Sequence, residues 1–127
     1  MRRFACLVLF TIAACTAPTP SEPHRIIVFF EEWSAKIDPQ AGSAISSAAQ
    51  WAKDHPGDSV KVTGYADPTG SAEANEYMSR TRAQRVADEL VADGVDRGRI
   101  VLGAKGATAF TLTSQESRRA EIAIGGP

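Results

Sequence analysis

The sequence predicts an α+β fold, a two-layer sandwich in which helices cover one face of a single sheet. Strand-like segments alternate along the chain with helix-like segments, which is the first observation behind this prediction. The second is size: 127 residues, 43% of them apolar, suit one modest core and are too few for two. Crossover connections between parallel strands are expected to be right-handed.

Residues 1–14 are predicted to be an export signal that precedes the fold. Arg2 and Arg3 supply a positive start, and an apolar stretch of about eleven residues follows. That stretch is too short for a bilayer, which needs roughly 20 residues. It closes on residues 12–15 (IAAC), which resemble the lipobox of bacterial lipoproteins, where the cysteine is acylated. The alternative is an ordinary signal peptide that is cleaved at another position, in which case Cys15 has no special role.

Residues 15–24 are predicted to form a proline-rich tether that begins at a lipidated Cys15. At about 3.1 Å per residue in polyproline form, it reaches on the order of 30 Å. The folded domain is then residues 25–127. Removal of residues 1–14 leaves twelve basic against fifteen acidic residues, a net charge of −3.

The first half of the domain predicts a strand, a helix and a second strand. The strand is Arg25 to Phe30, a continuous run of β-branched and aromatic residues that predicts burial on both faces. Asp38 suits a helix N-cap and Pro39 the first helical position, and residues 54–57 (DHPG) end that helix. Residues 59–65 alternate as the next strand. The apolar face of the helix consists of Ala41, Ile45, Ala48 and Ala52.

The second half predicts a longer helix and two more strands. Ser71 is the expected N-cap of the helix, and Gly94 is its expected end. Strands are predicted at Arg99 to Leu102 and Arg119 to Ile124, with a small, polar segment from Gly103 to Thr113 between them. The helix packs on the sheet through an apolar stripe of Ala83, Val86, Ala87 and Leu90.

Charge and residue counts disfavour several classes of function. Fourteen basic against fifteen acidic residues give no excess positive charge for a phosphate backbone, so no nucleic-acid partner is expected. Cys6, Cys15, His24 and His55 are too few soft ligands for a structural zinc site, so neither a metal nor a cofactor is expected. No paired acid and base groups indicate a hydrolase, and a noncatalytic chain is predicted.

A polar stripe on the longer helix is the candidate binding site. Asn75 and Arg82 are seven residues apart and lie within about 20° of each other, with Ser79 near them, at the edge of the buried face. Asp67 lies in the preceding loop. A carboxylate and a guanidinium across a shallow groove suit a zwitterion, and the amides of residues 69–71 are further donors for an anion. Spacing alone also fits an Asx turn at Asp67 and a solvated Arg82.

The segment GYADPTGSAEANEYMSRTRAQRVADEL, residues 64–90, resembles the signature of OmpA-like peptidoglycan-binding domains. The family pattern is a Gly-x-x-Asp-x-x-Gly turn followed by Asn-x-x-Leu-Ser-x-x-Arg-Ala-x-x-Val. The residues that fit are Gly64, Asp67, Gly70, Asn75, Ser79, Arg82, Ala83 and Val86, with Met78 for the leucine. The flanking segments VFFEEWSAKIDPQA, GVDRGRI and SRRAEI also resemble the family. The resemblance covers roughly residues 25–124 and implies a βαβαβ(α)β order on a mixed four-stranded sheet.

The resemblance implies noncovalent binding of the diaminopimelate in the peptidoglycan stem peptide, whose side chain ends in a zwitterion. Asp67 matches the family residue that holds the ammonium, and Arg82 matches the one that binds the carboxylate. Asn75 and Arg118 match supporting positions. Because of Cys15, the family members that this chain resembles most are the lipoproteins. They imply an outer-membrane anchor, a domain that faces the periplasm, and Tol-type envelope proteins as partners.

The sequence departs from the family where ligand contacts are expected. Trp33 stands where many members have Asp or Asn, so that contact is either lost or made by Glu32. Ala107 replaces a usual Glu, and the loop after it is short. These departures leave a second function open, an envelope scaffold with a weakened wall site that binds a protein partner. Trp33 and Trp51 are expected to pack rather than to form a sugar-stacking platform.

Overall fold

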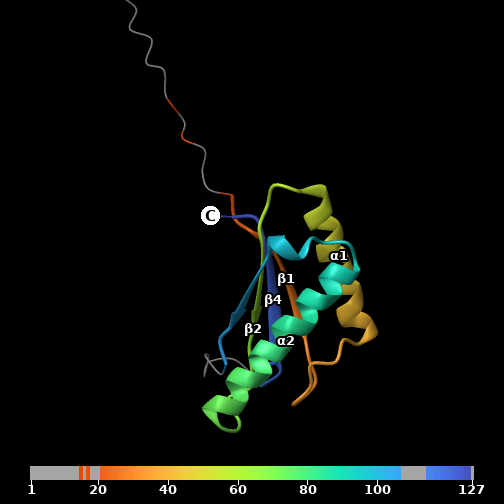
Figure 1. Cartoon of the computed structure of the whole chain (residues 1–127). Coiled ribbons are helices and arrows are strands. Elements are labelled where there is room, and N and C mark those ends of the chain that lie inside the picture. The colour runs from red at the N-terminus through yellow and green to blue at the C-terminus, as the bar shows by residue number, and fades with distance from the viewer. Residues whose placement is uncertain (1–14, 16, 18–20, 107–113, 127) are drawn as a thin grey trace, which may run out of the picture.

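A computed structural model describes residues 15, 17, 21–106 and 114–126. Four strands form one sheet, and two long helices lie on one of its faces, so the predicted α+β sandwich is confirmed (Figure 1). The signal segment and most of the tether lie outside the described residues. The elements are β1 (His24–Phe29), α1 (Pro39–Asp54), β2 (Val60–Gly64), α2 (Ala72–Ala92), the 3-10 turn η1 (Arg97–Arg99), β3 (Ile100–Ala104), α3 (Ser114–Ser117) and β4 (Arg119–Ile124).

The sheet is mixed, and its strand order is β1-β4-β2-β3. The last strand, β4, lies between β1 and β2 and runs antiparallel to both, whereas β2 and β3 are parallel. Ile122 at the centre of β4 is paired with Ile26 on one side and Val62 on the other. The prediction for this strand is confirmed in both position and length.

The prediction that β1 is covered on both faces is wrong. Ile27 is 46% exposed and Phe29 is 45% exposed, while Val28 between them is buried. The physical reason is that β1 is an edge strand and the helices cover only one face of the sheet, which a continuous apolar run does not reveal. The strand also begins at His24, which is paired with Ile124, so this residue belongs to the domain and not to the tether.

The helix boundaries follow the predicted caps. Asp38 accepts a 2.7 Å hydrogen bond from the Ala41 amide at the start of α1. Ser71 accepts one of 3.1 Å from the Ala74 amide at the start of α2. Gly94 has a φ of +101° just after α2, a conformation that favours glycine. All the predicted apolar positions of both helices are buried. Within the described residues, no helix is long and apolar enough to cross a membrane.

The third strand is displaced from its predicted position. Residues 97–99 form η1, and β3 runs from residue 100 to 104, two residues further than predicted. The small, polar segment therefore starts inside the strand, and its residues 107–113 lie outside the described part of the chain.

α2 lies unusually close to β2 at Gly64. A Cβ atom added there would lie 1.8 Å from the Ser79 carbonyl oxygen, so only glycine permits this approach. The Ser79 hydroxyl accepts a 3.0 Å hydrogen bond from the Gly106 amide, which joins the helix to the segment after β3. The polar stripe of α2 is thereby held against the end of the sheet.

Candidate functional site

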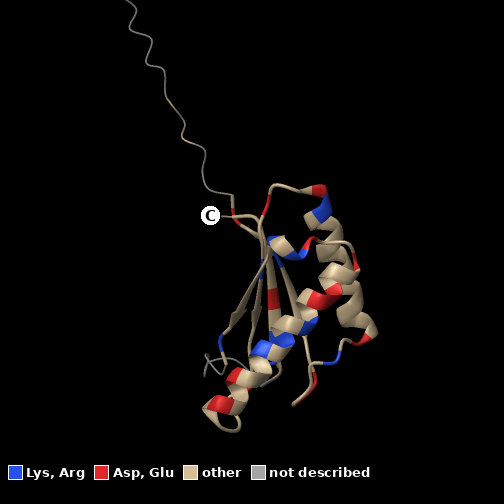
Figure 2. Cartoon of the chain, viewed as in Figure 1, with Lys and Arg blue, Asp and Glu red and all other residues tan. Residues whose placement is uncertain are grey.

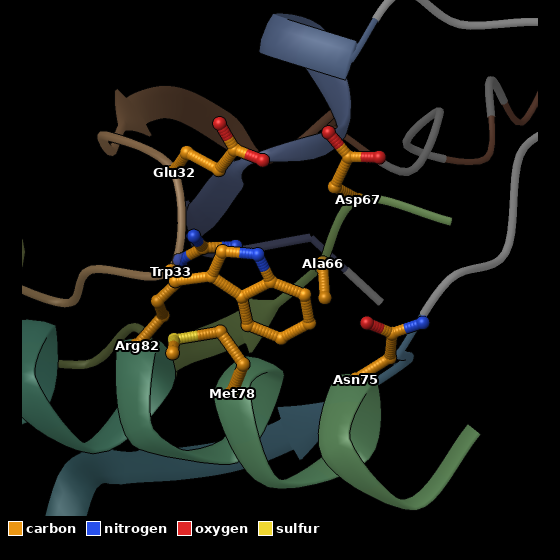
Figure 3. Close-up of a pocket in the computed structure, with 7 residues that line it drawn as sticks. All are labelled: Glu32, Trp33, Ala66, Asp67, Asn75, Met78 and Arg82. Carbon is orange, nitrogen blue, oxygen red and sulfur yellow. The ribbon is translucent and has the colours of Figure 1, made fainter. Parts of the chain in front are cut away.

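The candidate site lies where β2 ends and α2 begins. A pocket there is lined by two residues of the β1–α1 loop, two of the β2–α2 loop and three of α2 (Figure 3). These residues are Glu32, Trp33, Ala66, Asp67, Asn75, Met78 and Arg82. The structure thus brings together four of the predicted site residues, and the fifth, Arg118, does not line the pocket but contacts Asp67.

Arg82 is the most deeply buried charged residue at this site. Only 1% of it is exposed, and it was expected at the edge of the buried face or in solvent; both expectations are wrong. The close approach of α2 at Gly64 explains its depth. Its Nε donates to the Ser34 carbonyl at 2.9 Å, Nη1 to Tyr65 at 2.9 Å and Nη2 to Glu31 at 3.1 Å. A guanidinium has five N–H groups, so two remain for a ligand.

The charges around Arg82 favour an anion. Burial, and to a smaller extent the neighbouring Arg118, lower the pKa of Arg82 to about 10, while Asp67 opposes both effects. In the buried part of the site, two guanidinium groups therefore lie beside one carboxylate, that of Asp67, while the carboxylate of Glu32 is exposed at the rim. The excess of positive charge in this buried part favours a ligand carboxylate there.

Asp67 is 7% exposed and already has two partners. Its Oδ1 accepts from the Thr69 amide at 3.2 Å, and its Oδ2 lies 3.5 Å from Nη1 of Arg118. The Asx turn is therefore present, and it does not exclude a ligand role. It does show that the Thr69 amide, which was predicted as a donor for an anion, is bonded to Asp67 instead.

Three buried polar atoms at this end of the molecule have no hydrogen-bond partner among the described residues. They are Asn75 Oδ1, Ser117 Oγ and Arg118 Nε. Buried polar atoms are nearly always paired, so these atoms indicate a capacity for a polar ligand. The oxygen of Asn75 points toward the pocket, while its nitrogen points away (Figure 3). Nothing in the sequence indicated that the Ser117 hydroxyl would be buried without a hydrogen-bond partner.

Trp33 fills most of the pocket. Its indole lies among the other lining side chains in Figure 3, and the remaining cavity is about 10 Å³, the room of about one water molecule. The tip of the ring lies 2.7 Å from the place where a Cβ on Gly70 would be. Trp33 is nevertheless 48% exposed. Glu32 lies at the rim and is exposed, as a residue that meets an incoming ligand would be.

Trp51 lies far from this site, and two imidazoles stack on its ring. His24 stacks on it with ring centroids 4.0 Å apart, and His55 stacks on it at 4.4 Å. These stacked contacts agree with its expected packing role. His55 also bonds the Trp51 carbonyl at 2.8 Å, at the end of α1.

The charges along α2 are of both signs. Figure 2 shows acidic and basic residues mixed along α2, and Arg80 pairs with Glu76 on its outer face at 2.6 Å. Across the described ranges, no group of three or more His, Cys, Asp or Glu residues could hold a metal ion.

Comparison with known proteins identifies relatives for most of the chain. A family model described as the OmpA family matches residues 29–123. "Probable lipoprotein YiaD" of Escherichia coli is 34% identical over 103 residues, which cover 76% of this chain and 47% of that protein. "Peptidoglycan-associated lipoprotein" of Legionella pneumophila is 30% identical over 82 residues, which cover 65% of this chain and 47% of that protein. The chain thus spans about half the length of these relatives.

Solved structures share the fold. The peptidoglycan-associated lipoprotein from Burkholderia pseudomallei superposes with a TM-score of 0.72 at 24% identity, covering 78% of this chain and 89% of that one. The cell wall anchor of the T6SS from Pseudomonas aeruginosa gives a TM-score of 0.68 at 24% identity, covering 84% of this chain and 83% of that one. These proteins are named as lipoproteins and an anchor and not as enzymes, which agrees with the predicted noncatalytic chain.

Proposed function

Because the chain belongs to the OmpA family, we propose that it binds peptidoglycan noncovalently through the diaminopimelate of the stem peptide. One observation supports this most: the carboxylate of Asp67 and the guanidinium of Arg82 line the same pocket. The end of the diaminopimelate side chain carries an ammonium and a carboxylate. This pair of opposite charges suits Asp67 and Arg82 respectively.

Each polar group of the pocket then has a role in holding this zwitterion. Asp67 accepts from the ammonium, and the unpaired Asn75 Oδ1 is a second acceptor. Arg82 donates its two remaining N–H groups to the carboxylate. Arg118 keeps the site positive and orients Asp67 through their 3.5 Å contact, and Glu32 adds a carboxylate at the rim.

The second part of the proposal is attachment to the outer membrane. Residues 1–14 are removed, Cys15 carries the lipid, and the domain faces the periplasm, so that it tethers the membrane to the cell wall. Relatives named as lipoproteins support this, and Tol-type envelope proteins are proposed partners. Cys15→Ser is expected to abolish acylation, as measured by the intact mass of the membrane fraction. A wild-type protein without lipid mass would overturn the anchor.

Sedimentation with isolated sacculi tests the wall-binding site. The full chain is expected to sediment with diaminopimelate-type sacculi, and Asp67→Asn and Arg82→Lys are expected to release it. Arg99→Lys is the matched control, because Arg99 also donates to backbone carbonyls in partly buried hydrogen bonds but lies far from the pocket. Equal sedimentation of all four proteins would contradict the site.

A scaffold function is the second candidate, and the small cavity beside Trp33 favours it. In that case the fold is kept, the wall site is weak, and the domain binds an envelope protein. A folded wild type that does not sediment with sacculi but still binds an envelope protein would favour the scaffold.

A further inference from the structure

Trp33 adopts a backbone conformation that is rare for a bulky residue. Its φ is +49°, and it occupies the third position of a turn closed by a 3.2 Å hydrogen bond from the Ser34 amide to the Glu31 carbonyl. Turns with a positive φ at this position favour glycine or asparagine, because a Cβ is strained there. Something in the structure must therefore stabilise the tryptophan in this place.

The indole supplies that stabilisation by crossing the pocket. It extends from the β1–α1 loop to Gly70 in the β2–α2 loop, where its tip is in close contact. In crossing, it takes the space between Asp67, Asn75 and Arg82 (Figure 3). The remaining cavity of about 10 Å³ holds about one water molecule and cannot hold an amino-acid head group.

The backbone of the turn is held in place, but the ring is not. Arg82 donates to the carbonyls at both ends of the turn, Glu31 and Ser34, so the turn cannot shift without breaking two partly buried hydrogen bonds. The indole, in contrast, is 48% exposed. The pocket can therefore open by rotation of the Trp33 side chain, with no movement of the backbone.

We propose that the Trp33 indole closes the pocket in the ligand-free protein and must rotate out before diaminopimelate enters. This inference rests on the proposed function. The measured affinity is then the affinity of the open pocket multiplied by the fraction of molecules that are open. A pocket that is open in about one molecule in ten binds about tenfold more weakly than one that is always open. Trp33 thus sets how tightly the chain holds the wall.

Calorimetric titration of the full chain with free meso-diaminopimelic acid tests this inference. Trp33→Asn removes the ring and suits the positive φ, and it is expected to lower Kd by about tenfold or more. Trp51→Asn is the matched control, since it makes the same change at the other partly exposed tryptophan, and it should leave Kd unchanged.

The outcomes separate this inference from the proposed function. If the wild type binds and Trp33→Asn binds equally or more weakly, the ring does not close the pocket, and the proposed function stands. If neither protein binds, both fail. A second readout uses Trp51→Phe, which leaves Trp33 as the sole tryptophan. When the ligand binds, the fluorescence emission of Trp33 should shift to longer wavelength, because the ring enters water. No shift, or a shift to shorter wavelength, would overturn the inference.

Discussion

The two ends of the sheet are built from the same kinds of residue but differ in what they leave unpaired. Each end has one partly exposed tryptophan and one arginine that donates to the carbonyls of three residues. At the closed end, where α1 finishes, Arg99 donates to Ala52, His55 and Asp58. At the pocket end, where α2 begins, Arg82 donates to Glu31, Ser34 and Tyr65.

The difference lies in the surrounding groups. At the closed end, Trp51 stacks with two imidazoles, those of His24 and His55. At the pocket end, Trp33 is in a strained turn, and one of the unpaired buried atoms found in the described residues, Asn75 Oδ1, belongs to a residue that lines the same pocket. An arginine that bonds carbonyls is therefore not by itself a sign of function. Unsatisfied polar atoms beside it are what distinguish a binding site from a structural joint.

The largest expected effect is on stability, from Arg82→Ala. Removal of the guanidinium leaves three carbonyls without this donor in a buried place, and we expect the free energy of unfolding to fall by about 4 kcal/mol. Arg99→Ala should cost about half as much, because Arg99 is less buried. Urea unfolding measures both. Equal losses would show that the pocket end is not the more tightly packed of the two.

Gly64→Ala should cause the next largest loss of stability. The new Cβ would meet the backbone of Ser79 at 1.8 Å, so α2 must move away from β2 at a cost of about 3 kcal/mol. Gly57→Ala, near the closed end, is the control, because a Cβ there meets no atom within 4 Å. Thermal unfolding compares the two variants, and a small loss for Gly64→Ala would mean that the close approach is not required.

Asp67→Asn tests the pocket end through binding. Loss of the charged acceptor should raise Kd for meso-diaminopimelic acid by roughly thirty-fold, about 2 kcal/mol, as measured by calorimetry. Asp58→Asn at the closed end should leave Kd unchanged. If the two variants bound alike, Asp67 would not be a ligand residue.

The smallest expected effect is that of Trp51→Ala. Loss of the contacts with His24 and His55 should lower stability by about 1 kcal/mol, since this stack is partly exposed. Sedimentation with sacculi should not change. Release from sacculi by a folded Trp51→Ala protein would mean that the closed end also takes part in wall binding.

Local chemistry made much of the fold predictable. Asp38, Ser71 and Gly94 determine where the helices begin and end, because capping depends on residues that are near in sequence. The exposed face of β1 was predicted wrongly from its apolar run, because such a run does not show whether one face of the sheet or both faces are covered. The position of β4 depends on pairing across the whole chain.

The sequence predicted which residues form the site, but not how deeply they are buried or what shape the pocket has. Spacing on the helix and the resemblance selected Asp67, Asn75 and Arg82, which the structure places in one pocket. Their burial depends on the contact at Gly64, which joins residues far apart in sequence. The left-handed conformation of Trp33 and the course of its ring across the pocket arise from tertiary contacts, which no local pattern reports.

The central claim is that the pocket end recognises the zwitterionic end of diaminopimelate. Sedimentation of the full chain with two kinds of sacculi tests it most directly, one with diaminopimelate and one with lysine in the stem peptide. A lysine side chain has the ammonium but lacks the carboxylate that Arg82 is proposed to bind. We expect retention on the diaminopimelate sacculi and release from the lysine sacculi. Equal retention on both would contradict the claim.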